Sequence, residues 1–118
     1  MPNILHPRHR RTSTVIARSR VMGRDDPEAV AVVTEALRAE GVLLVGSGSI
    51  THNLGELDWQ AGPEQIEPWA QAFRDWIVAQ LESQNTAALQ DYRRQAPHAA
   101  RNHPSDEHLL PLFFAEAA

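Results

Sequence analysis

The feature that most constrains the fold is the apolar run from Val42 to Val45, which directly follows a predicted helix. The run shows no polar alternation, a pattern typical of a strand buried on both faces in a parallel sheet covered by helices. The preceding helix is predicted to begin at Pro27, where the missing N–H costs nothing, and to end at Gly41. Its expected apolar face consists of Val30, Val33 and Leu37. A helix that leads into a buried strand predicts an α/β fold, with a parallel-type strand flanked by helices.

Further helices are predicted along the carboxyl-terminal part of the chain. One begins near Pro68 and carries an apolar stripe, interpreted as core rather than as a cofactor contact: Trp69, Ala70, Phe73, Ile77 and Leu81. A short helix is expected over residues 86–95. The last helix should begin near Glu107 or His108, because Pro111 is tolerated only within a first helical turn.

Composition limits the classes of function that are open to the chain. Its 118 residues suit a single domain, and no apolar stretch approaches the roughly 20 residues that span a bilayer. The net charge of −4 argues against a polyanionic partner. We therefore expect a cytoplasmic protein with neither a membrane nor a nucleic-acid partner.

Charge divides the sequence into two parts. Residues 1–24 contain six Arg and no acidic residue, whereas residues 25–118 contain five Arg and fifteen acidic residues. We predict that residues 1–24 form a basic, disordered leader. A targeting role or non-specific nucleic-acid binding by this leader remains open. Residues 25–118 are predicted to form the folded domain.

Histidines are the candidate functional residues. Because the sequence contains no Cys, any metal must be held by His, Asp or Glu. His52 follows the predicted strand, where open α/β sheets bind ligands, and suits a metal ligand or a general acid/base. His108 lies at the predicted start of the last helix, where the neutral, metal-binding imidazole is favoured. A loop His is more often a simple hydrogen-bonding residue, so spacing alone leaves both interpretations open.

Several motifs, in order along the chain, resemble one enzyme family. They run from Gly41 to Leu54, Leu57 to Trp59, Pro68 to Ala70, Asp91 to Arg93, Ala96 to Arg101 and His103 to Leu112. Together they resemble the carboxyl-terminal half of class III extradiol ring-cleavage dioxygenases, particularly the DOPA extradiol dioxygenase branch. The resemblance covers about three-quarters of the chain, from Pro27 to Ala118.

The resemblance implies a non-haem metal enzyme that opens the ring of a catechol. Its substrates would be a DOPA-like catechol and O₂, and its cofactor Fe(II), with Zn(II) as the alternative. His52 matches an active-site His that serves as a metal ligand or acid/base catalyst. His108 matches a metal-binding position.

The family's two other metal-binding His come from an amino-terminal half whose motifs are absent from this sequence. We therefore expect a partial α/β domain, truncated relative to the family, in which a basic leader stands in place of that half. Activity would then need another chain that supplies the missing ligands. The alternative is a catalytically inactive remnant, or a small α/β module without an enzymatic role.

Overall fold

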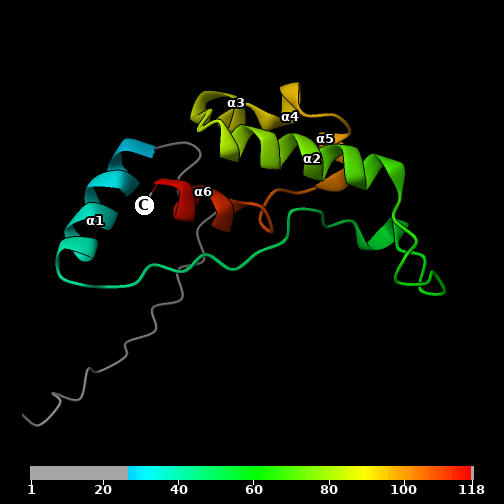
Figure 1. The fold of residues 1–118 in the computed structure, drawn as a ribbon, viewed down its shortest axis with the longest axis horizontal. Coiled ribbons are helices and arrows are strands. Elements are labelled where there is room, and N and C mark those ends of the chain that lie inside the picture. The colour runs from blue at the N-terminus through cyan, green and yellow to red at the C-terminus, as the bar shows by residue number, and fades with distance from the viewer. Residues whose placement is uncertain (1–26, 118) are drawn as a thin grey trace, which may run out of the picture.

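Helices and irregular connections make up residues 27–117, the part of the chain that the computed structural model describes (Figure 1). In chain order the helices are α1 (Pro27–Ala39), the 3-10 helix η1 (Leu54–Glu56), α2 (Pro68–Glu82), α3 (Thr86–Gln90), α4 (Tyr92–Gln95), α5 (Ala99–Asn102) and α6 (Leu110–Ala117). The predicted leader, residues 1–24, lies outside the described residues. Among residues 27–117, no helix has the length and apolar character needed to cross a membrane.

The predicted α/β class is wrong, because residues 27–117 contain no strand. Val42 to Val45 instead form a connection after α1 in which Leu44 is half-buried and the other three residues are exposed, Leu43 by 85%. A strand is held by ladder hydrogen bonds to a neighbouring extended segment, and the described residues provide no such segment here. The N–H of Val42 instead donates to the carbonyl oxygen of Leu37 at the end of α1 (3.0 Å). The apolar run therefore has the side chains of a buried strand without the partner that a strand needs.

Helix α1 has the predicted ends but a different buried face. It begins at Pro27, and Gly41 after its end adopts a φ of 77°, which glycine tolerates without strain. Of the expected apolar face, Leu37 is half-buried but Val33 is 61% exposed, and the side chain of Val30 lies outside the described part of the chain. Thr34 is buried instead, and its hydroxyl donates to the carbonyl oxygen of Ala31 (3.1 Å). Because α1 packs against α6, its buried face is rotated relative to the predicted one.

The hydrophobic core lies between α2 and the helices that follow it. Pro68 opens α2, and Phe73 and Ile77 are fully buried on it, as the sequence predicts. The α2 helix contacts α3 and α5. The other buried core residues come from α3 to α6 and their connections: Leu89, Tyr92, Ala96, Ala99, Leu109, Leu110 and Phe113.

Two predicted helices differ in their bounds. The helix expected over residues 86–95 is divided at Asp91 into α3 and α4. The last helix begins at Leu110, later than predicted, after a turn in which the Asp106 carbonyl oxygen accepts the backbone N–H of Leu110 (3.1 Å). His108 therefore lies in the turn before α6 rather than within its first helical turn.

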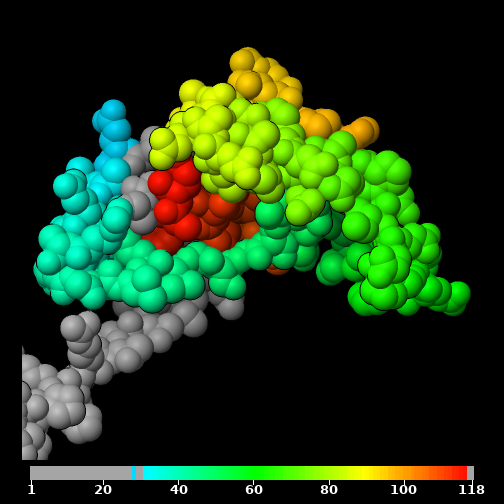
Figure 2. Space-filling view, viewed as in Figure 1, coloured from blue at the N-terminus to red at the C-terminus, as the bar shows by residue number. Residues whose placement is uncertain are grey.

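The connection between α1 and η1 passes very close to the start of α6. Figure 2 shows this connection in teal, between the cyan surface of α1 and the red surface of the carboxyl-terminal residues. A Cβ atom on Gly46 would lie 2.4 Å from the carbonyl oxygen of Pro111, and one on Gly48 would lie 2.4 Å from that of His108. Only glycine permits such an approach. The two glycines therefore allow the following residues to reach the turn that carries His108.

Candidate functional site

Two segments that are distant in sequence meet beside α6. The backbone N–H of Ser49 donates to the carbonyl oxygen of His108 (2.8 Å), and that of His52 donates to the carbonyl oxygen of Asn102 (3.0 Å). These hydrogen bonds tie residues 49–52 to residues 102–108. The candidate histidines of the two segments consequently face each other.

The imidazole rings of His52 and His108 stack on one another. Their centroids are 3.4 Å apart and their planes are inclined by 16°. His52 is half-buried, whereas His108 is exposed. The structure therefore brings together the two residues that the sequence analysis selected, while their predicted roles remain predictions.

The stacked arrangement limits how the pair can bind a metal. Imidazole nitrogen lone pairs lie in the ring plane, so in two nearly parallel rings they run side by side and do not converge. One ring would have to rotate for both His52 and His108 to bind a single ion. Among residues 27–117, no group of three or more His, Asp or Glu is placed to hold a metal ion. This part of the chain thus offers two imidazole donors at the site.

His103 supports the segment that carries His52. Its ring is fully buried, and its Nε2 lies 2.5 Å from the carbonyl oxygen of Ile50. Because a carbonyl oxygen only accepts, Nε2 must carry the proton of this bond. Burial lowers the pKa of His103 from its ordinary value, while the bond to Ile50 opposes this lowering. The ring is therefore held neutral, and its buried Nδ1 has no hydrogen-bond partner among the described residues.

His98 does not join this cluster. Its backbone has a left-handed φ of 55° at the start of α5, and its side chain is exposed. Its carbonyl oxygen accepts both the backbone N–H (2.9 Å) and the side-chain Nδ2 (3.0 Å) of Asn102. His98 thus contributes to the start of α5 through its backbone.

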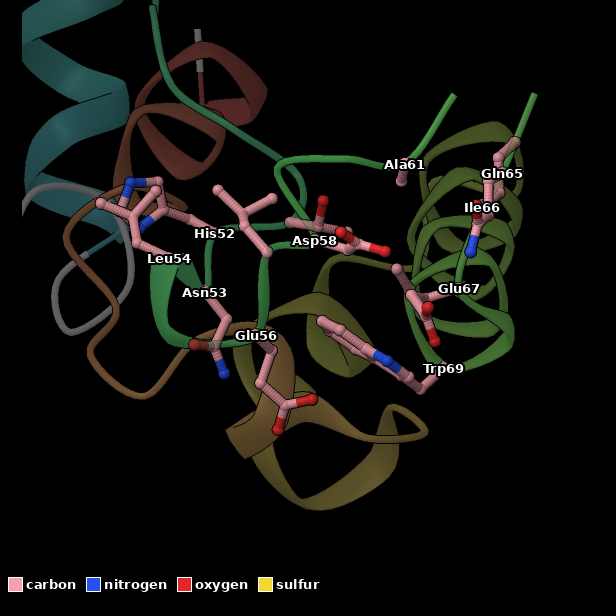
Figure 3. A pocket seen from close by; sticks show the side chains of 13 residues that line it. His52, Asn53, Leu54, Glu56, Asp58, Ala61, Gln65, Ile66, Glu67 and Trp69 are labelled. Atoms are coloured by element: carbon pink, nitrogen blue, oxygen red, sulfur yellow. The ribbon is translucent and has the colours of Figure 1, made fainter. Parts of the chain in front are cut away.

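A cavity of about 290 Å³ opens next to His52 (Figure 3). Its lining comes from residues 51–58 on one side and residues 61–70 on the other. The indole of Trp69 and the carboxylates of Glu56, Asp58 and Glu67 are among the lining side chains. Its volume lies near the lower end of the range of small-molecule sites, so it suits a ligand with a single ring.

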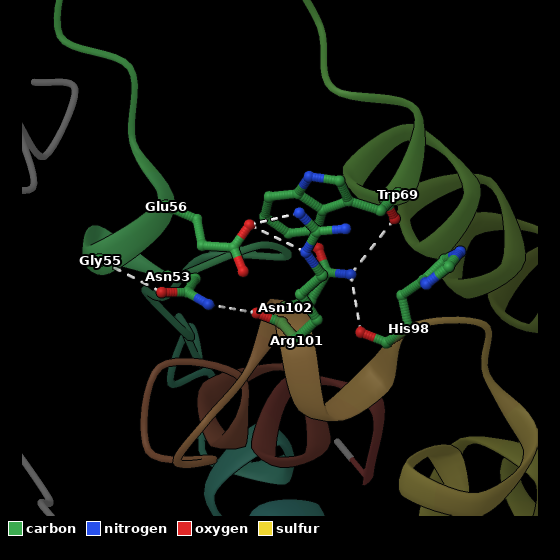
Figure 4. A network of polar contacts seen from close by, with 7 residues as sticks. All are labelled: Asn53, Gly55, Glu56, Trp69, His98, Arg101 and Asn102. Atoms are coloured by element: carbon green, nitrogen blue, oxygen red, sulfur yellow. Dashed lines mark hydrogen bonds and ion pairs between the residues drawn. The ribbon is translucent and has the colours of Figure 1, made fainter.

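A polar network holds one wall of this cavity (Figure 4). The Arg101 guanidinium donates from Nε to a carboxylate oxygen of Glu56 (2.9 Å), and its Cζ lies 4.6 Å from the centroid of the Trp69 ring. The side chain of Asn53 donates to the carbonyl oxygen of Arg101 (2.6 Å) and accepts the backbone N–H of Gly55 (3.1 Å). The hydrogen bond from Arg101 lowers the pKa of the Glu56 carboxyl, which keeps it ionised.

The places of Arg101 and Trp69 at the cavity were not predicted from the sequence. Trp69 was interpreted as core, but its ring is half-buried and lines the cavity. Arg101 and Asn53 stand within motifs of the family resemblance, yet no spacing rule links residue 53 to residue 101. The only local signal is the Asn at the start of η1, since Asn commonly caps a helical turn.

Comparison with curated proteins identifies relatives of one kind. The chain is 34% identical over 85 residues to the 4,5-DOPA dioxygenase extradiol of Escherichia coli (strain K12), an alignment that covers 70% of this chain and 31% of that protein. It is 37% identical over 83 residues to the protein of the same name from Beta vulgaris, with 70% and 30% covered. The protein of that name from Mirabilis jalapa is 34% identical over 82 residues. No family model matches the chain, and no solved structure matches it.

These matches confirm the resemblance that the motifs predict. The chain is related to the 4,5-DOPA dioxygenases extradiol over 70% of its own length. It spans about 30% of the length of these curated relatives. The activity and substrate in these names therefore belong to proteins whose sequences lie mostly outside the aligned segment.

Proposed function

We propose, on the premise of this relationship, that the chain provides part of the active site of an extradiol dioxygenase that opens the ring of a DOPA-like catechol with O₂. The proposal is supported chiefly by the proximity of His52 and His108, whose ring centroids lie 3.4 Å apart, so that rotation of one ring would let both bind one ion. Residues 25–118 would form this catalytic part, and residues 1–24 would be a separate leader. In ring opening, both atoms of O₂ enter the product and the carbon–carbon bond beside the diol breaks, so no external reductant is consumed.

The proposed cofactor is Fe(II), with Zn(II) as the alternative. His52 and His108 would hold it, since neutral imidazole is a common ligand of both ions. When bound, the metal would bring catechol and O₂ together at one charged centre. A catalytic metal site of this kind normally uses three protein ligands, and residues 27–117 place two imidazoles here. The remaining ligands would come from outside residues 27–117, so these residues alone are expected to bind metal weakly.

The catechol would occupy the cavity beside His52. Its volume of about 290 Å³ suits one aromatic ring, and the Trp69 indole offers an apolar wall for that ring. From the edge of the cavity, the His52 imidazole can accept the proton that a catechol hydroxyl releases when its oxygen becomes a ligand. Because a neutral imidazole has one nitrogen lone pair, His52 would act either as this base or as a metal ligand in a given step.

Metal titration of the purified chain tests the proposed ligands. Isothermal titration calorimetry with Zn(II), and with Fe(II) under anaerobic conditions, should give weak one-to-one binding that is lost in His52→Ala and in His108→Ala. Both variants should keep the far-UV circular dichroism of the helices, because neither side chain belongs to the hydrophobic core. His98→Asn is the matched control, since this His is exposed and Asn tolerates a left-handed φ. Equal binding by all four proteins would refute the ligand assignment.

Activity needs a second experiment. The chain would be co-expressed with the part of the Escherichia coli relative that the alignment leaves unmatched, and O₂ uptake would be measured with DOPA and with Fe(II). Uptake with the wild-type chain and none with His52→Ala would support the proposal. No uptake from any combination, in samples in which the two polypeptides co-purify, would favour the inactive remnant instead.

A further inference from the structure

We propose that Arg101 is a positioning residue, which fixes the His52 ring against His108 by clamping the turn that follows His52. We call Asn53, Glu56, Trp69 and Arg101 the clamp. The importance of the clamp to catalysis depends on the proposed function. Its role in placing the two rings does not depend on that function. The clamp joins α5 to η1 and to the start of α2, three elements that are separate in sequence.

The turn has little else to hold it. None of the η1 residues is buried, and Leu54 is 60% exposed, so apolar packing cannot fix this turn. Its tertiary hydrogen bonds are polar contacts to α5: the Asn53 side chain donates to the carbonyl oxygen of Arg101, and the Glu56 carboxylate accepts from the Arg101 guanidinium. One residue therefore holds both ends of η1, by its backbone at one end and by its side chain at the other.

His52 is coupled directly to the clamp. It precedes Asn53, and its own backbone N–H donates to the carbonyl oxygen of Asn102, the neighbour of Arg101 (3.0 Å). Any shift of η1 relative to α5 must therefore move the His52 backbone. Since the two imidazoles are 3.4 Å apart, a displacement of an ångström would break their stacking.

Arginine fits this role better than lysine. The guanidinium donates to Glu56 from both Nε and a terminal nitrogen while its Cζ lies over the Trp69 ring, 4.6 Å from the centroid. A lysine ammonium could keep the charge and one hydrogen bond, but not the planar contact and the paired donors together. The side chain of Arg101 is partly exposed, so we expect it to set geometry rather than global stability.

The first test reads ring placement without a metal. In ¹H NMR spectra of the metal-free chain, the imidazole protons of His52 and His108 should show the upfield shifts that stacking causes. These signals should move toward the positions of an exposed His in Arg101→Ala, and only partly in Arg101→Lys and Glu56→Gln. Arg94→Ala is the matched control, because Arg94 also forms a surface ion pair, with Asp91 (2.8 Å), on another helix. The signals should stay in place in Arg94→Ala.

The second test reads metal affinity. Metal binding needs one of the two rings to rotate, so the clamp would aid it by keeping the His52 backbone within reach of His108. Removal of groups that orient metal ligands typically weakens metal binding by about 10- to 100-fold, and we expect a loss of this size for Zn(II) in Arg101→Ala, with partial recovery in Arg101→Lys. Circular dichroism would show whether each variant keeps its helices, and Glu56→Gln serves if Arg101→Ala does not fold. If the wild-type chain binds no Zn(II), the proposed function fails while the NMR test still decides the role of Arg101. Unchanged His52 and His108 signals in a folded Arg101→Ala would overturn this inference.

Discussion

The two halves of the described chain are held together in different ways. From α2 onward, apolar side chains from successive helices form a core, and Phe73, Ile77 and Tyr92 in it have no exposed surface. Between α1 and α2, by contrast, most large apolar side chains face solvent: Val42, Leu43, Val45, Leu54, Leu57, Trp59 and Ile66. The first region is held by packing, and the second chiefly by hydrogen bonds and close backbone contact, with Ile50 as its apolar contact with the core. Residues 49–53, which include His52, belong to the second.

This difference places the candidate site on a boundary. His103 is buried in the packed region, and the turn with His108 leads into α6, whereas His52 comes from the exposed connection. The His52 ring keeps its position because polar groups of residues 101–108 hold the connection between α1 and α2. Mutations in the packed region should therefore change stability, and mutations along the connection should change the geometry of the site.

The largest expected effect is in the packed region. Phe73→Ala removes a fully buried ring that contacts Tyr92 and His103, with centroids 6.2 Å and 5.6 Å away. Such a cavity typically costs about 3–5 kcal/mol, which is a large part of the stability of a small domain. Urea unfolding followed by circular dichroism would measure the loss. Leu43→Ala in the exposed connection is the control, and we expect it to change the free energy of unfolding by less than about 0.5 kcal/mol. Similar losses in the two variants would contradict the comparison.

A smaller effect is expected where the connection touches α6. Gly48→Ala would place a Cβ atom 2.4 Å from the His108 carbonyl oxygen, a backbone atom that cannot move alone. Forcing extra volume into a packed contact typically costs about 1–3 kcal/mol. Because Ser49 bonds to the same oxygen, the shift should also separate the two stacked rings, which the imidazole NMR signals would report. Gly62→Ala is the control, since its Cβ would meet no atom within 4 Å. A Gly48→Ala protein with wild-type stability and NMR signals would show that the contact is not tight.

Local signals explain the part of the fold that the sequence predicts. Both long helices, α1 and α2, begin at the expected prolines, because a proline at the first helical position acts within one turn. The buried positions Phe73 and Ile77 were likewise predicted from helical spacing. Each of these inferences needs only residues that are close in sequence.

Several failures depend on distant partners. Val42 to Val45 have strand-like side chains, but a strand forms only beside another extended segment, which residues 27–117 do not supply. The predicted face of α1 was wrong at Val33, because the position of α6, and not the α1 sequence, decides which side is covered. In the site, the pairing of His52 with His108 as metal ligands came from the family resemblance alone. The clamp around Arg101 joins residues that no periodic pattern connects.

The smallest expected effect is a dependence of stability on pH that arises from His103. Burial lowers the pKa of this residue below its ordinary value, and the bond to Ile50 opposes the shift. Three neighbouring positive or ionisable groups add to the lowering: His52, His108 and Arg93. Below about pH 6.5 the unfolded chain binds a proton that the folded chain does not, so the free energy of unfolding should fall as the pH falls, until the folded pKa is passed.

His103→Gln keeps a donor for the Ile50 carbonyl oxygen but cannot titrate. Urea unfolding between pH 7 and pH 5 should therefore show a shallower decline for His103→Gln than for the wild type, and equal declines would mean that His103 is protonated in the folded chain as readily as in the unfolded one.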